Sequence, residues 1–69
     1  MVEVFKTNVQ GTEQAELLID LLSQYFPGSK INFDLDDCDR ILRIEGNNFI
    51  AGNVIRELRK QGFMCHLLE

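Results

Sequence analysis

Residues 31–45 read INFDLDDCDRILRIE, and this stretch decides the fold. Apolar and polar residues alternate over 31–35 and again over 41–45, which is the period of a half-buried β-strand. The polar residues 36–39 between the two runs are short enough to form the turn of a β-hairpin. The apolar side chains predicted to face inward are Ile31, Phe33, Leu35, Leu42 and Ile44. The outward side chains of the second strand are then Ile41, Arg43 and Glu45.

A helical pattern precedes this hairpin. Apolar residues recur at helical spacing over 12–26 and form a broad stripe suited to face a core. Thr12 is the predicted N-cap, and Pro27 followed by Gly28 is the predicted stop. This segment therefore predicts an amphipathic helix.

A second helical pattern follows the hairpin. Asn47 or Asn48 is its predicted N-cap, and Gly62 is its predicted stop. Gly52 lies inside the pattern, where glycine costs about 0.5–1 kcal/mol relative to alanine. We interpret Gly52 as a place of close helix contact.

Strand-like alternation also opens and closes the chain, over residues 2–8 and 63–68. The order of elements is therefore βαββαβ over one domain, residues 1–69. Right-handed crossovers in two strand-helix-strand halves predict an α+β, ferredoxin-like sandwich. We expect a four-stranded antiparallel sheet with spatial order 4-1-3-2 and both helices on one face.

Composition and charge argue against some classes of function. The chain has 69 residues, seven Lys and Arg against eleven Asp and Glu, and a formal net charge of −4, a balance that argues against nucleic acid as a ligand. The longest apolar cluster, residues 17–22, is interrupted by Asp20 and is too short to span a membrane. Residues 1–6 do not resemble a signal peptide. We therefore expect a cytoplasmic protein that does not bind membranes and keeps its two cysteines reduced.

The sheet face without helices is the predicted interaction surface. On the expected strand registers, outward-facing side chains from three neighbouring strands could form one apolar stripe. The residues assigned to this surface are Phe5, Ile41, Met64 and His66. We expect it to contact a protein partner or a second copy of the chain.

One end of the sandwich is a second candidate for a binding site. The loop after the first strand, the hairpin turn and the loop before the last strand should meet there. The candidates at this loop end are Gly11, Thr12, Cys38 and Gly62. A small ligand could bind at this end.

Four segments support a resemblance to a known family: Val2-Glu3-Val4, Ile41-Leu42-Arg43-Ile44, Asn53-Val54-Ile55 and Gly62-Phe63. With the order of elements around them, they resemble the heavy-metal-associated domain of copper chaperones and metal-transporting ATPase tails. The resemblance implies the fold and docking on a protein partner. That family binds soft metals through Met-x-Cys-x-x-Cys in the loop after the first strand. Residues 7–14 contain no Cys, His or Met, so no metal ligand can be carried over and no cofactor is expected.

Three residues remain weak candidates for a soft metal: Cys38, Cys65 and His66. Cys38 should be exposed in the hairpin turn, and Cys65 should be a small buried side chain. The first strand should lie between the strand that follows Cys38 and the strand that contains Cys65, which separates the two residues by about 10 Å, so a disulfide between them is not expected. The aspartates around Cys38 lack the glycine of a calcium-binding loop and suggest a solvated hairpin tip.

A non-catalytic interaction or regulatory module is the expected function. His66 is the only histidine, and its neighbour Cys65 should point to the opposite face, so no Cys-His catalytic pair can form. Two alternatives stay open. One is a metal- or thiol-dependent binding protein that uses Cys38 or the Cys65-His66 pair, and the other is a small-ligand sensor.

Overall fold

The computed structural model describes residues 1–68. Within this range the elements follow one another in the predicted order. They are β1 (Val2–Thr7), α1 (Thr12–Tyr25), β2 (Lys30–Asp34), β3 (Ile41–Glu45), α2 (Ala51–Lys60) and β4 (Cys65–Leu68).

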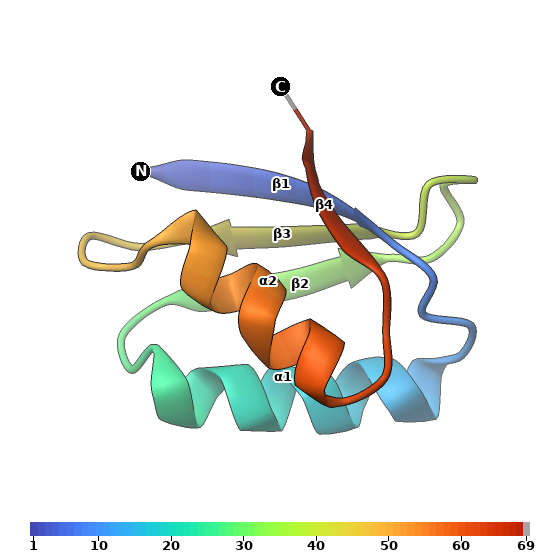
Figure 1. Cartoon of the computed structure of the whole chain (residues 1–69), viewed down its shortest axis with the longest axis horizontal. Coiled ribbons are helices and arrows are strands. Elements are labelled where there is room, and N and C mark those ends of the chain that lie inside the picture. Colours follow the sequence, from blue (N-terminus) through green and yellow to red (C-terminus); the bar gives the residue numbers. More distant parts are fainter. Residues whose placement is uncertain (69) are drawn as a thin grey trace.

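The strands form one antiparallel sheet in the order β2-β3-β1-β4. This is the predicted order 4-1-3-2 read in reverse, so the ferredoxin-like arrangement is confirmed. Both helices lie on the same side of the sheet (Figure 1), with α1 packed against β2 and α2 against β4. Over residues 1–68, neither helix is long and apolar enough to cross a membrane.

The core lies between the sheet and the two helices. Burial of apolar surface there is the main source of stability for a chain this small. Its largest fully buried side chains are Phe5, Leu22, Leu42, Ile44, Leu58, Val9, Val54 and Cys65. In the hairpin, the predicted inward positions are confirmed for Leu42 and Ile44, and Arg43 between them is exposed.

The predicted face of β1 was wrong. Phe5 is 0% exposed and pairs with Leu42 in the register, and Thr7 is also buried. Both therefore point toward the helices, whereas Val4 points to the helix-free side. The reason is volume: the core between two helices accepts the large Phe5 ring, and burying that ring removes more apolar surface from water than burying a valine.

The helix starts also differ from the predictions. Thr12 is the first residue of α1, and its N-cap is Gly11, which provides no side-chain hydrogen bond. The N-cap of α2 is Ile50 rather than Asn47 or Asn48, again without a side-chain bond. Both N-cap residues have extended backbone, and both helices therefore begin without a hydrogen bond from a polar cap side chain.

The end of α2 is formed as predicted at Gly62. Gly62 has φ +91°, and its N–H donates to the carbonyl of Arg59 at 3.0 Å, while the N–H of Phe63 donates to the carbonyl of Leu58 at 3.1 Å. This pair of bonds is a Schellman motif, which requires a left-handed residue and so favours glycine. Because residues 62–64 complete this motif and its exit, β4 begins at Cys65 rather than at 63.

Gly52 does not lie in a close contact. Among the described residues, no atom is within 4 Å of the position that a Cβ would take there. The interpretation of Gly52 as a tight helix contact was therefore wrong.

Candidate functional site

The helix-free face of the sheet is built by alternate residues of the four strands. Register fixes which side chains are neighbours, because residues opposite one another on adjacent strands point to the same face. One row runs across the sheet through Asn32, Arg43, Val4 and Leu68. The next row runs through Asp34, Ile41, Lys6 and His66. A third, shorter row contains Lys30, Glu45 and Val2.

The apolar part of this face differs from the predicted stripe. Ile41 lies on it, half-buried, and His66 is exposed on it, as predicted. Phe5 is absent because it belongs to the core. Met64 is 53% exposed but precedes β4, and its backbone N–H donates to the Asn8 side chain at 2.8 Å.

Three residues outside the predicted stripe complete the apolar surface. Val2, Val4 and Leu68 point to the helix-free side, and Leu68 is 39% exposed. Val4 lies directly between Leu68 and Arg43 in the register. The signal that identifies Val4 as part of this surface is its pairing with residues of both neighbouring strands, which the sequence alone does not give.

Charges frame the apolar residues. The face carries three basic residues, Lys6, Lys30 and Arg43, and two acidic residues, Asp34 and Glu45. The rest of the chain then has four basic and nine acidic residues. The helix-free face thus carries a small net positive charge on a protein whose total charge is negative. Two exposed ion pairs hold its side chains, Arg43 with Glu45 at 3.6 Å and Lys6 with Asp39 at 3.4 Å.

The loop end is assembled as predicted, although by residues that the sequence interpretation did not single out. The N–H of Thr7 donates to the carbonyl of Asp39 at 3.1 Å, and the buried hydroxyl of Thr7 donates to the carbonyl of Arg40. The guanidinium of Arg40 donates to the carbonyl of Gln10 at 3.2 Å. With the bond between Asn8 and Met64, these contacts join the three loops.

Arg40 has an unusual backbone. Its φ of +48° is uncommon for a residue other than glycine. Its N–H donates to the carbonyl of Asp37 at 3.0 Å, which closes the turn, while Thr7 binds its carbonyl. The loop end is therefore held by a hydrogen-bond network. Of the loop-end candidates, Gly11 and Thr12 begin α1, Gly62 ends α2 and Cys38 is exposed in the turn.

Cys38 lies between two carboxylates. The potential ligand atoms of Asp37, Cys38 and Asp39 are all within 4.8 Å of one another. Asp37 Oδ1 already accepts a hydrogen bond from the N–H of Asp39 at 2.8 Å, and Asp39 pairs with Lys6. These contacts account for the geometry of the turn by themselves, so the cluster is explained without an ion.

Cys65 and His66 do not form a joint site. Cys65 is fully buried toward the helices, whereas His66 is exposed on the other face. Burial raises the pKa of the Cys65 thiol from 9.0 to about 11, an effect that the positive charge of Arg59 partly opposes. Cys65 is therefore a neutral thiol near pH 7. Both cysteines are free, as predicted.

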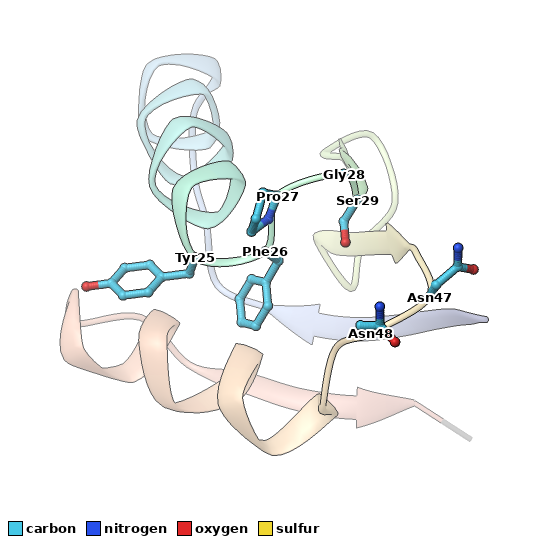
Figure 2. A pocket seen from close by; sticks show the side chains of 7 residues that line it. All are labelled: Tyr25, Phe26, Pro27, Gly28, Ser29, Asn47 and Asn48. Carbon is cyan, nitrogen blue, oxygen red and sulfur yellow. The ribbon is translucent and has the colours of Figure 1, made fainter.

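A cavity of about 310 Å³ lies at the end of the molecule opposite to the loop end. It is lined by the turn after α1 and the loop before α2, with Tyr25, Phe26, Pro27, Gly28, Ser29, Asn47 and Asn48 (Figure 2). The ring of Tyr25 points away from Asn47 and Asn48 in this view. Amide and hydroxyl groups dominate the polar lining, so the cavity offers hydrogen bonds but no acid-base pair.

Comparisons of the chain with models of known protein families, with curated proteins and with solved structures found no match.

Proposed function

We propose that this protein is a non-catalytic interaction module that binds a protein partner through the helix-free face of its sheet. One observation supports the proposal above the others. Val2, Val4, Ile41 and Leu68 form an apolar surface on that face, and they lie between charged residues rather than within the core. An apolar centre with a polar rim is typical of protein interfaces.

The chemistry of the face suggests the chemistry of the partner. Lys6, Lys30 and Arg43 outnumber the two acidic residues of this face, although the protein has a net charge of −4. An acidic rim around an apolar centre on the partner would complement it. The partner surface should also be flat, because the face is an open sheet.

The proposal agrees with the resemblance to the heavy-metal-associated family, whose domains dock on partners. It also includes the cytoplasm as the location, since the exposed thiol of Cys38 is suited to a reducing compartment.

The experiment compares two surfaces of the same protein. The face variant is Val4→Glu with Ile41→Lys, and the matched control is Leu17→Glu on α1, where Leu17 is 71% exposed. Proteins recovered with the wild type are purified and titrated, and amide shifts of the labelled module are followed by NMR. We expect saturable binding that shifts the amides of β1 and β3, that is lost in the face variant and that is unchanged in the control.

Circular dichroism first establishes that each variant is folded. Binding that survives in the face variant but is lost in Leu17→Glu would contradict the proposal and would place the interface on α1. Shifts confined to the loop end, near Gly11 and Cys38, would contradict it in favour of a site there.

A further inference from the structure

The free edge of β2 is accessible. β2 lies at one end of the sheet order and pairs with β3 alone. In the described part of the chain, residues 30–34 take part in no backbone hydrogen bond outside the sheet. An edge strand of this kind presents unpaired N–H and C=O groups to any strand that approaches it.

Two of the usual protections of an edge, a proline and a bulge, are missing from β2. The strand contains no proline, and its pairing with β3 is continuous from Lys30 to Asp34, so no bulge bends it away. α1 packs on the helix side of β2, but a groove of about 330 Å³ lies between α1 and residues 32–36. Phe33, Leu35 and Ile19 line this groove and are only half-buried.

The sequence of β2, KINFD, is complementary to itself in the antiparallel direction. If a two-fold axis passes through Asn32, Lys30 lies opposite Asp34 of the second copy, and Ile31 lies opposite Phe33 of the second copy. Side chains alternate between faces, so both charge pairs fall on the helix-free side and both apolar pairs on the core side. Opposite charges and large apolar side chains are favourable partners across antiparallel strands.

The two charges are available for such a contact. Within residues 1–68, neither Lys30 nor Asp34 takes part in an ion pair. Asp34 Oδ1 accepts one hydrogen bond, from the N–H of Asp36 at 3.2 Å, and both side chains are exposed. The other edge strand, β4, reads CHLL and has no such pattern.

We propose that two copies of this chain pair antiparallel through the β2 edge, about a two-fold axis at Asn32, and join their sheets into one. The axis is perpendicular to the sheet, so both helix layers lie on one side and both helix-free faces on the other. The incoming strand satisfies the open backbone groups and covers Phe33. This self-association is independent of the proposed binding of a partner, which involves the face rather than the edge.

Charge reversal gives a direct test. Lys30→Asp places two aspartates in each contact, and Asp34→Lys places two lysines there, so each variant alone repels itself. An equal mixture restores both opposite-charge contacts in a heterodimer. We expect sedimentation velocity to show a wild-type dimer, a dissociation constant about tenfold or more higher for each variant alone, and recovery of the dimer in the mixture.

The matched control is Lys6→Glu, which reverses a charge on the helix-free face of β1, a strand that β3 separates from the β2 edge. It should leave the dimer intact, and circular dichroism should show that all variants are folded. A wild type that stays monomeric at millimolar concentration would overturn the proposal. A dimer that is unchanged by both β2 substitutions, or a mixture that does not recover the dimer, would also overturn it. A dimer lost in Lys6→Glu would overturn it as well, because the contact would then lie on the face.

Discussion

The two faces of the sheet carry similar kinds of residues and have opposite roles. The helix-covered face of β1 and β3 contains Phe5, Leu42 and Ile44, all fully buried. The helix-free face of the same strands contains Val4, Ile41 and Arg43, which are half-buried or exposed. An apolar side chain on a strand therefore does not by itself identify the core.

The largest expected effect tests this difference directly. Phe5→Ala should destabilise the protein by about 3–5 kcal/mol, because it removes a ring from the core and leaves a cavity. Val4→Ala, one residue away on the other face, should cost at most about 1 kcal/mol. Urea denaturation of both variants measures the contrast.

Phe5→Ala could leave too little folded protein to measure in a chain of this size. Phe5→Leu is then the control, since it keeps most of the volume and should cost about 1–2 kcal/mol. Equal costs for the substitutions at positions 4 and 5 would show that the faces of β1 are not as described.

The two cysteines allow a similar comparison between a buried and an exposed position. Cys65 lies on the helix-covered face, and Cys38 lies in the hairpin turn. Cys65→Ala should cost about 1–2 kcal/mol through lost packing, whereas Cys38→Ser should be within about 0.5 kcal/mol of the wild type. In the native protein, a thiol reagent should modify Cys38 rapidly and Cys65 only as fast as the protein opens. Rapid modification of both thiols would contradict the burial of Cys65.

The thiol of Cys65 also predicts a pH dependence. Burial raises its pKa from 9.0 to about 11, so between these values the unfolded chain loses the thiol proton while the folded chain keeps it. Stability contributed by the neutral thiol is complete below pH 9 and falls as the pH rises toward 11. The free energy of unfolding should therefore decline more steeply over this range in the wild type than in Cys65→Ala. Parallel curves would exclude the thiol as the cause.

The sequence predicts a strand's faces well only where one side of the strand is clearly polar. β3 was predicted with its bounds and faces because Arg43 and Glu45 alternate with apolar residues, so one side is clearly polar. β1 has apolar residues on both sides, Val2 and Val4 on one and Phe5 on the other, and its alternation could not tell the faces apart. The prediction that placed Phe5 on the helix-free face was therefore wrong.

The site was predicted only in part for a similar reason. Ile41, His66 and Leu68 can be placed on the helix-free face by alternation alone, but Val4 becomes visible only through pairing between strands. The network around Thr7 depends on a residue 33 positions away in the sequence, Arg40. No local pattern reports a contact of that range.

A smaller change in stability is expected for a substitution in α2, which packs on the helix-covered face of the sheet. Gly52→Ala should stabilise the protein by about 0.5–1 kcal/mol, because alanine loses less conformational freedom in a helix. The added Cβ would meet no atom within 4 Å among the described residues. Thermal unfolding should show the increase, and a decrease would restore the interpretation of a close contact at this position.

The smallest expected effect belongs to the helix-free face itself. Arg43 and Glu45 form an ion pair at 3.6 Å with side chains 47% and 45% exposed, and a pair this open contributes about 0–1 kcal/mol. Arg43→Ala should therefore change the free energy of unfolding by less than about 0.5 kcal/mol, and added salt should reduce the change further. Urea denaturation at low and high salt provides the measurement, with Leu42→Ala, a core substitution on the same strand, as the contrast. A cost above about 2 kcal/mol would mean that Arg43 supports the fold, and substitutions on this face would then no longer separate binding from stability.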